Sequence, residues 1–461
     1  MTDAVTRTPQ TPPREEAVLS RHPGLDVRRA LRAGTEELQN RRYDPWEKVR
    51  RRDPPEGLTR EGWWWGIKQA RAAGRRGIGL EDPGGRPFTF TPTDAMAEAQ
   101  HRVDLSMGGR VPLPDAITSP ETRGRYLVSS LVEEAFRSSQ IEGAAVTRDR
   151  AREMIRTDRK ARDRDERMIL NNYLTMEWLK QKKDEPVTPE TLLEIQCRMT
   201  EGTLKDPGDA GRFRGADREI DISDAYGHVS HVPPPAGELP GRVAALCAFA
   251  NAGSTPPDAS GASEDTGRAE PFLHPLIRSV LLHFWPAYDH PFVDGNGRTA
   301  RALFYWSMLR HGYWLFEFVS ISSVIRQTGK RYDRAYLHTE TDGNDLNFFI
   351  HYHLEVVERA VQELHRFIER KSQSTRDIER RLRDDSTLNH RQLGLLSHAL
   401  RHPGHGYLIR SHQSSHGVSY QTARTDLLDL HARGLLGKRK RGNADRFVPV
   451  PDLEARLADA R

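Results

Sequence analysis

The 461 residues are 36% hydrophobic and 29% charged, which predicts two or three domains and excludes a membrane-spanning protein, because no apolar stretch approaches the roughly 20 residues of a spanning helix. The first residues lack the apolar centre of a secretory signal, so we expect a cytoplasmic protein with no membrane partner. Seventy Lys and Arg against 65 Asp and Glu leave a net charge of +5, which by itself does not indicate nucleic-acid binding.

The N-terminal quarter carries few recognisable signals. Residues 1–25 are rich in Pro, Thr and charge and are predicted to form a disordered tail. Residues 26–115 are interpreted as an accessory region without an assigned function. Within it, Trp63–Trp65 are expected to pack as a structural wedge, and the alternating segment 87–91 indicates a short strand. Cys197 and Cys247 lie in helix-like patterns without metal-ligand spacing and are expected to be core thiols.

Residues 116–375 show apolar residues at helical spacing and are predicted to form one helical domain. A helix runs toward Ser138 and Glu142, and a second is expected over about 148–182, with the sign-alternating run 159–167 as a solvated face. Pro189 after Thr188 is typical of a helix start. Further predicted elements are a hairpin of 219–222 and 229–232, a flexible insertion at 252–269, a helix from 275 and a long helix over about 346–378.

Residues 385–461 are predicted to form a separate small domain. Helical patterns cover 392–400, 409–415 and 419–433, with Ser419 as a plausible N-cap. Two short strands joined by a basic turn at Lys438–Arg441 follow. This basic run is the densest uncompensated one in the chain.

The segment His290–Arg301 combines several groups that chemistry on phosphates requires. The turn Gly295–Asn296–Gly297 opens a helix, and such a turn points backbone N–H groups at an anion. Arg298 and Arg301 lie three apart on that helix and therefore share a face, where guanidinium groups can hold phosphate oxygens. No Walker lysine or kinase glycine loop is present.

The same segment also holds a candidate metal ligand and a candidate base. Asp294 offers the hard oxygen that Mg²⁺ takes beside phosphates. His290 is largely neutral near pH 7 at its ordinary pKa and can accept a proton from a hydroxyl. Either short string alone, His-Pro-Phe or Gly-Asn-Gly, would be read as a surface turn. Their combination predicts a phosphate-cleaving or nucleotidyl-transfer site.

The segment resembles the core motif of the Fic family, His-Pro-Phe-x-x-Gly-Asn-Gly-Arg-x-x-Arg, with every fixed position filled. The resemblance extends over about 120–370, including Leu204–Arg214, the hairpin that ends in Val232-Pro-Pro-Pro, and His274–Arg278. It implies a mainly α fold: a Fic helical core (116–375) with a small β-hairpin flap, followed by a winged helix-turn-helix domain (385–461).

The resemblance implies transfer of AMP from ATP to a Ser, Thr or Tyr hydroxyl of a protein. His290 would be the general base and Asp294 would hold Mg²⁺. The implied nucleotide-binding residues are Gly295, Asn296, Gly297, Arg298, Thr299, Arg301 and Tyr332, although Thr339 stands where some members carry an Asn. The implied flap residues, which would align the target segment by strand-like contacts, are His228, Val229, Ser230 and His231.

The segment Ser138–Gly143 resembles the inhibitory pattern of the family, Ser or Thr, three residues, Glu, then Gly or Asn. By this resemblance Glu142 would pair with Arg301 and block the γ-phosphate, with Ser138 and Gly143 completing the motif. The simpler alternative is a solvated glutamate at a helix end.

The C-terminal helices and basic hairpin resemble a winged helix with Tyr420–Leu430 as the recognition helix. DNA, a protein partner or a second copy of the chain are the expected candidates for this domain. Three other functions stay open: removal of AMP by the same site, transfer of another phosphate-linked group, and a DNA-binding regulator with a nucleotide-sensing core. For the target protein, self-modification of this chain is one alternative.

Overall fold

The computed structural model of the protein describes residues 8–39, 42–107, 120–218, 220–223, 229–252, 272–384, 387–402, 405–441 and 444–459. It is mainly helical, as expected. The chain divides into two compact units, one of residues 1–110 and 131–361, the other of residues 111–130 and 362–461. Among the described helices, none combines the length and apolar character that a membrane crossing needs.

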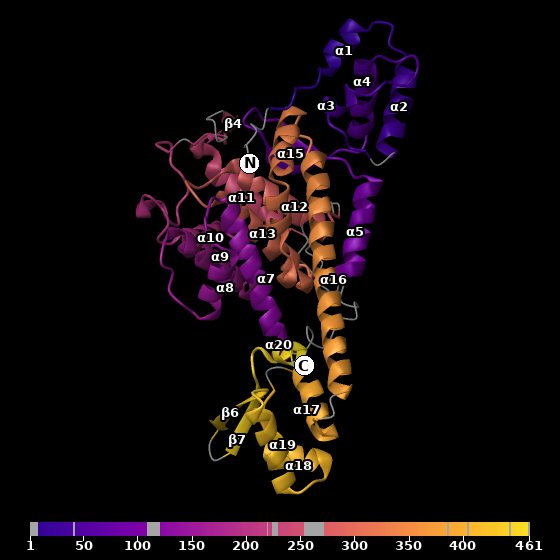
Figure 1. The fold of residues 1–461 in the computed structure, drawn as a ribbon. Helices are drawn as coiled ribbons and strands as arrows, with labels where there is room; N and C mark the ends of the chain where they lie inside the picture. The colour runs from indigo at the N-terminus through magenta and orange to yellow at the C-terminus, as the bar shows by residue number, and fades with distance from the viewer. Residues whose placement is uncertain are drawn as a thin grey trace, which may run out of the picture. The chain divides into compact units, whose positions relative to one another are not determined.

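Within the described residues, the N-terminal region contains helices α1 to α5 (Figure 1) and one β-hairpin. The helices are α1 (Glu15–Arg21), α2 (Val27–Gln39), α3 (Trp46–Val49), α4 (Arg60–Ala72) and α5 (Asp94–Met107), and the strands are β1 (Arg76–Glu81) and β2 (Pro87–Phe90). Helices α2 and α4 cross closely because each has a glycine at the crossing point, Gly34 in α2 and Gly66 in α4. A Cβ on Gly34 would lie 2.1 Å from the carbonyl oxygen of Gly66.

Two predictions for this region have clear outcomes. Trp63, Trp64 and Trp65 are all buried on α4, so the prediction of packed structural aromatics is confirmed. The prediction of a disordered tail over 1–25 is wrong for its second half. Helix α1 forms there, and its Val18 is 1% exposed in the same apolar cluster as the tryptophans, because α4 offers a surface that composition does not reveal.

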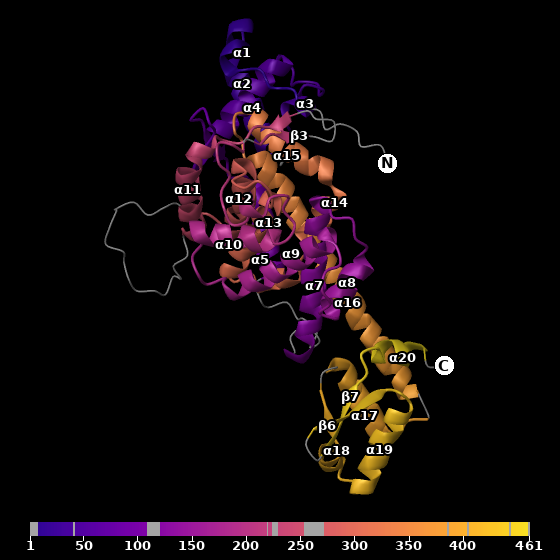
Figure 2. The same ribbon diagram turned by 90° about the vertical axis from the view of Figure 1, so that its left-hand side faces the viewer.

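The helical core holds α7 to α16 (Figure 2). Helices α12 and α13 lie at its centre, and every residue of α13 from Arg298 to Leu309 is buried. The helices are α7 (Pro120–Ile141), α8 (Arg148–Arg156), α9 (Arg164–Gln181), α10 (Pro189–Thr200), α11 (Leu239–Asn251), α12 (Pro275–Asp289), α13 (Asn296–Arg310), α14 (Ile321–Gln327), α15 (Gly329–Thr341) and α16 (Asn347–Asp384). Short 3₁₀ turns are η1 (Pro207–Asp209), η2 (Ala236–Glu238) and η3 (Trp314–Phe318), and the hairpin is β3 (Ile222–Ser223) with β4 (Val229–His231).

The single helix predicted over 148–182 is two helices, α8 and α9. The hydroxyl of Thr157 donates back to the carbonyl of Glu153 where α8 ends, and the Asp163 carboxylate caps the N-terminus of α9. The run 159–167 is also not simply a solvated face. Glu166 is fully buried, and hydrogen bonds from Arg159 lower its pKa to about 2 despite the opposing effect of burial.

Several other predicted elements agree with the structure. Thr188 forms a capping box at the start of α10. The predicted hairpin forms with antiparallel strands, but its first strand is Ile222–Ser223 rather than 219–222. Helix α12 begins at Pro275. Cys247 is buried and Cys197 half-buried, and neither is bonded to another cysteine. Residues 253–269 of the expected insertion lie outside the described residues.

The accessory hairpin β1–β2 packs on the turn between α15 and α16. The N–H of Leu346 donates to the carbonyl of Thr89 at 2.9 Å, and the N–H of Thr89 donates to the carbonyl of Asn344 at 3.1 Å. The side chain of Asn347 makes two further hydrogen bonds to the backbone of Thr91. The hairpin therefore fixes the end of α15.

The C-terminal unit has α17 (His390–Arg401), β5 (Tyr407–Leu408), α18 (Ile409–His416), α19 (Tyr420–Ala432), β6 (Leu436–Arg441), β7 (Ala444–Pro449) and α20 (Leu453–Asp459). Its three-stranded sheet has the order β5-β7-β6. Ser419 caps α19 by accepting from the N–H of Thr422, as predicted. Strand β5 and helix α20 were not predicted, because elements of two and seven residues show little periodicity.

Candidate active site

The loop after α12 begins with an unusual backbone conformation at His290. Its φ of 46° and ψ of 56° are left-handed, which is uncommon for a residue other than glycine. Its N–H donates to the carbonyl of Pro286 at 3.1 Å and so closes the helix. This geometry turns the chain sharply where the helix ends and directs the imidazole to the cavity described below.

The loop is clamped at its base by Asn296 and packed by Phe292. The Asn296 side chain accepts from the N–H of Phe292 at 2.9 Å and donates to the carbonyl of the same residue at 2.8 Å. Phe292 is 1% exposed and stacks on Phe213 with ring centres 5.4 Å apart. Asn296 was predicted to form part of the nucleotide cradle, and its side chain makes two hydrogen bonds to the Phe292 backbone that shape the loop.

Arg214 holds the loop from the opposite side. Its Nε donates to the carbonyl of His290 at 2.8 Å, and its Nη2 donates to the carbonyls of Pro234 and Asp289. Its own N–H donates to the carbonyl of Pro291 at 2.9 Å. Arg214 lies at the end of the segment Leu204–Arg214, and no local pattern in that segment indicates this role.

His290 has the protonation state of a general base. Its Nδ1 lies 3.3 Å from the carbonyl oxygen of Ala287, so Nδ1 carries the proton and Nε2 is the acceptor. Burial lowers the pKa of His290 to about 4, although the Ala287 carbonyl and Glu142 oppose this shift. The imidazole is therefore neutral at physiological pH.

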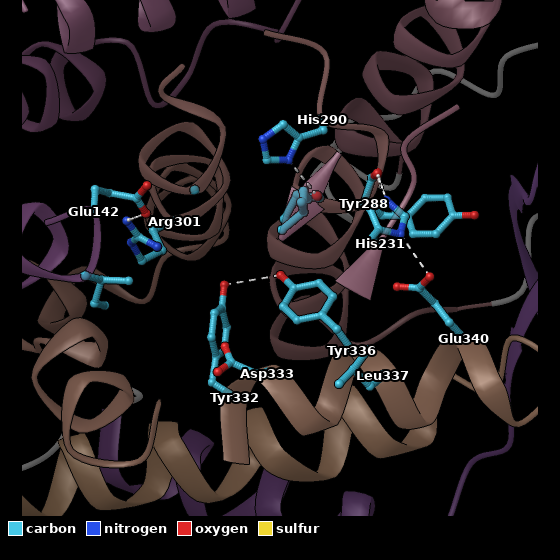
Figure 3. Close-up of a pocket in the computed structure, with 14 residues that line it drawn as sticks. Glu142, His231, Tyr288, His290, Arg301, Tyr332, Asp333, Tyr336, Leu337 and Glu340 are labelled. Atoms are coloured by element: carbon cyan, nitrogen blue, oxygen red, sulfur yellow. Dashed lines mark hydrogen bonds and ion pairs between the residues drawn. The ribbon is translucent and has the colours of Figure 1, made fainter. Parts of the chain in front are cut away.

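His290 and Arg301 open onto one cavity of about 390 Å³ (Figure 3). One wall is a face of α15, whose residues are spaced three and four apart as one helical face requires. The cavity is lined by Ile141, Glu142, Ile222, His231, Ala287, Tyr288, His290, Gly297, Arg301, Tyr332, Asp333, Tyr336, Leu337 and Glu340. Of these, sequence reasoning named Glu142, His231, His290, Gly297, Arg301 and Tyr332.

Arg301 is paired with the segment Ser138–Glu142, as the resemblance implied. Its Nη2 donates to Glu142 Oε1 at 2.8 Å, while its Nε donates to the hydroxyl of Ser138 at 2.8 Å. Burial alone would raise the pKa of Glu142, but the charges of Arg301 and Arg298 lower it overall. The carboxylate therefore stays ionised within the cavity, and Gly143 follows it with a left-handed φ of 95°.

Gly297 provides the room for this ion pair. A Cβ at this position would lie 2.3 Å from Glu142 Oε1 and 3.1 Å from Arg301 Nη1. Any larger residue would push the carboxylate away from the guanidinium. The glycine thus serves the close approach of Glu142, and an anion replacing Glu142 would use the same space.

Among the residues predicted to bind nucleotide or metal, those that do not line the cavity are Asp294, Gly295, Asn296, Arg298 and Thr299. Arg298 is buried, donating from Nη1 to the carbonyl of Met199 and from Nη2 to Asp294 Oδ1. Its Nε and the hydroxyl of Thr299 are buried without a hydrogen-bond partner among the described residues. These polar atoms lie beside the loop rather than in the cavity.

Asp294 retains one oxygen with which it could hold a cation. Its Oδ1 accepts from Arg298 and from the N–H of Gly295, whereas Oδ2 is 3.8 Å from Arg164 and accepts no hydrogen bond among the described residues. Mg²⁺ takes one or two protein carboxylates and completes its shell with phosphate and water. The donor set therefore fits a magnesium ion brought in with phosphates.

The flap is anchored through His231. Its Nδ1 lies 2.9 Å from Glu340 Oε2 on α15, and its Nε2 lies 2.7 Å from the carbonyl oxygen of Tyr288. Val229 is 48% exposed, and Ser230 lies between them in β4. His228 lies outside the described residues. The side chain of His231, a predicted flap residue, thus holds the base of the hairpin.

Tyr332 lines the cavity, and its hydroxyl is positioned by two neighbouring side chains. Its hydroxyl is 3.2 Å from Nε2 of His283 and 3.3 Å from the hydroxyl of Tyr336. His283 is fully buried, and burial lowers its pKa well below the ordinary value. Thr339 is also buried and bonds only within its own helix, to the carbonyl of Ala335.

Comparison with known proteins bears directly on this site. The sequence profile of the Fic/DOC family matches residues 186–308, a range that contains the whole loop from His290 to Arg301. The chain contains a Fic domain. Ser138, Glu142 and Tyr332 lie outside the matched range, so their assignment rests on the geometry above.

Curated relatives carry the same domain. The chain is 27% identical over 180 residues to "Protein adenylyltransferase Fic" of Nematostella vectensis and 30% identical over 186 residues to the protein of that name in Drosophila melanogaster. Each match covers 39% of this chain, and 34% and 32% of the relatives. The chain thus spans about a third of the length of the curated relatives it matches.

Two solved structures are similar to parts of this chain. A Fic family protein from Desulfovibrio desulfuricans is 19% identical with a TM-score of 0.48, covering 78% of this chain and 97% of that one. A Fic domain containing signaling protein from Bacteroides thetaiotaomicron is 19% identical with a TM-score of 0.46, covering 59% and 98%.

Proposed function

We propose that this protein is an adenylyltransferase that moves AMP from ATP to a Ser, Thr or Tyr hydroxyl of a protein. The observation that carries the proposal is that a neutral histidine, His290, and a buried arginine, Arg301, open onto one cavity within a Fic domain. A base and a phosphate-binding cation on the same cavity are what nucleotidyl transfer to a hydroxyl requires. The names of the curated relatives support the same activity.

In this reaction the target hydroxyl oxygen attacks the α-phosphorus of ATP. A P–O bond forms there while the bond to the β-phosphate oxygen breaks, and pyrophosphate leaves. The hydroxyl proton passes to Nε2 of His290, which the Ala287 carbonyl orients through Nδ1. The low pKa of His290 keeps Nε2 free to accept this proton.

The nucleotide would be held by side chains that line the cavity and by side chains of the loop from His290 to Arg301. Arg301 would bind phosphate oxygens once Glu142 is displaced, and the space beside Gly297 would admit them. Tyr332, Tyr336 and Leu337 would contact the nucleoside through their apolar surfaces. Mg²⁺ held by Asp294 would neutralise phosphate charge when bound.

The native chain is proposed to be held at low activity by Glu142. Its carboxylate accepts a hydrogen bond from the Arg301 guanidinium, which a phosphate would otherwise bind, and the Nε of the same arginine donates to the Ser138 hydroxyl. ATP must therefore compete with an intramolecular anion. The solvated-glutamate alternative is disfavoured, because the Glu142 side chain is 25% exposed and bonds Arg301 directly.

The test is the intact mass of the Glu142→Gly protein after incubation with ATP and Mg²⁺, alone and with a cell lysate. We expect an AMP adduct on the chain or on a lysate protein, and no adduct when His290→Ala is added. Equal labelling with and without His290, or no labelling in either sample, would refute adenylyl transfer.

Removal of AMP is a second candidate, favoured by one observation. Glu142 stays ionised in the same cavity as His290, so it could activate a water molecule against an AMP-protein bond. Incubating an AMP-modified substrate with the native chain distinguishes the two reactions. Release that needs Glu142 supports removal, whereas release unaffected by Glu142→Gln contradicts it.

A further inference from the structure

The C-terminal unit carries a concentration of positive charge that the catalytic reaction does not use. Residues 387–461 hold twelve Lys and Arg against six Asp and Glu, a net charge of +6, whereas the whole chain has +5. The remaining residues are therefore close to neutral overall. Because the net positive charge is concentrated in residues 387–461, an anionic partner is expected for this unit rather than for the whole protein.

Helices α18 and α19 form a helix–turn–helix. Gly417 ends α18 with a left-handed φ of 61°, and Ser419 caps α19, so the turn is three residues long. Ala423 and Leu427 of α19 are fully buried. A turn of three to four residues with a glycine is typical of the motif whose second helix enters a DNA groove.

The two acidic residues of α19, Asp426 and Asp429, are both paired with groups of the same unit. Asp426 is 4% exposed and accepts from Nε of Arg391 at 2.7 Å and from Asn389 at 2.8 Å. Asp429 accepts from Gln392 at 2.7 Å and from Arg433 at 2.9 Å. The carboxylates are thus neutralised within the unit and do not oppose an anion on the outer face.

The outer face of α19 carries groups suited to base edges. Tyr420 is 49% exposed, and Gln421, Arg424 and Thr425 are also exposed. Arg424 has no ion-pair partner in the part of the chain that the structure describes. Arginine and glutamine are side chains that pair with base edges in the major groove.

The hairpin β6–β7 places two arginines directly opposite each other. Arg439 pairs with Arg446 in the ladder, and like charges in this position are destabilising unless an anion lies between them. Neither has an ion-pair partner within the described residues. The neighbouring Lys438 is paired with Asp445 at 2.8 Å, while the adjacent Lys440 is exposed.

We propose that the C-terminal unit binds duplex DNA, with α19 in the major groove and the hairpin β6–β7 on the phosphate backbone. Arg424 reads base edges, and Arg439, Lys440 and Arg446 contact phosphates. This activity is independent of the proposed adenylyl transfer, because no residue of the Fic cavity takes part. His290→Ala is therefore expected to bind DNA as the native chain does.

The test is fluorescence anisotropy of the full chain with a labelled random-sequence duplex of about 20 base pairs, two helical turns. We expect binding that weakens steeply with added salt, because each phosphate contact contributes about 0.9 to the slope of log K against log salt. The double variant Arg439→Ala/Lys440→Ala should reduce this slope by about 2. The matched control is Arg75→Ala/Arg76→Ala, two exposed basic residues in the other unit, which should leave the slope unchanged.

A second measurement isolates the base contact. After selection of a preferred duplex from a randomised pool, Arg424→Ala should lose roughly 10- to 100-fold of the preference while binding random duplex nearly as before. Absence of binding at low salt, or equal salt slopes for the hairpin and control variants, would overturn the proposal. A thermal unfolding midpoint close to that of the native chain shows that each variant is folded.

Discussion

Replacing Glu142 tests the central contact of the site. Glu142→Gln keeps the size of the side chain but removes the charge that occupies Arg301, whose Nε remains fixed by Ser138. A charge-assisted hydrogen bond between phosphate and a freed guanidinium contributes about 1.5–3 kcal/mol. We therefore expect the Kd for a non-hydrolysable ATP analogue to fall by roughly 10- to 100-fold.

The same substitution should lower the stability of the free protein. Breaking a fully buried ion pair costs about 3–5 kcal/mol, and we expect about 1–2 kcal/mol here because the Glu142 side chain is 25% exposed at a cavity. ATP analogue should restore this loss by supplying the missing anion. The rise in the thermal midpoint on adding ligand is then larger for the variant than for the native chain.

Isothermal titration calorimetry and thermal unfolding measure the two effects. The control is Glu133→Gln, on the same helix but paired with Arg137 and Arg148, which should leave the Kd unchanged. If Glu142→Gln binds the analogue no more tightly than Glu133→Gln does, the contact with Arg301 does not restrict nucleotide binding, and the proposed inhibition fails.

Three further substitutions test the positioning groups. In the Glu142→Gly background, Arg214→Ala should lower kcat by roughly 10- to 100-fold with little change in the Kd of nucleotide, because the loss of hydrogen bonds to three carbonyls shifts His290. Arg214→Lys should recover part of the rate. An effect on the Kd alone would contradict this positioning role. Burial alone would lower the pKa of His231, but the hydrogen bond and the charge of Glu340 raise it overall. The ion pair between His231 and Glu340 therefore stabilises the fold fully below about pH 6.5, and this stabilisation is lost as the pH rises through the pKa of His231 in the folded protein. The stability difference between native chain and Glu340→Gln, measured by denaturant unfolding, should accordingly shrink above that range, and a constant difference would refute the charged link. Asp294→Asn should remove most of the Mg²⁺ dependence of transfer in the Glu142→Gly background, whereas an unchanged Mg²⁺ titration would show that another group holds the metal.

Local spacing along the chain predicted the phosphate-binding groups of the central loop, and apolar periodicity predicted most of the helices. The spacing of His290, Gly295, Gly297 and Arg301 is local, and a glycine turn before a helix has the same physical consequence in any fold. Helix starts such as Thr188 were also readable, because capping depends on residues within one turn.

Which of those groups share a cavity depends on contacts between helices that are far apart in the chain. Arg298 and Arg301 lie on one helix, yet one faces Met199 and the other faces Glu142, because packing on α10 and α7 sets the rotation of α13. The use of Asn296 as a clamp likewise depends on the loop conformation.

The contribution of distant segments could not be predicted for the same reason. Arg214 lies 76 residues before His290 in the chain and holds its carbonyl, and no periodicity relates such positions. The α15 face from Tyr332 to Glu340 is a helical stripe that sequence could have found, but only contact with the flap and with α12 shows that it lines the site. The pairing of Glu142 with Arg301 was implied by a motif, and its strength is set by burial, which only the folded chain provides.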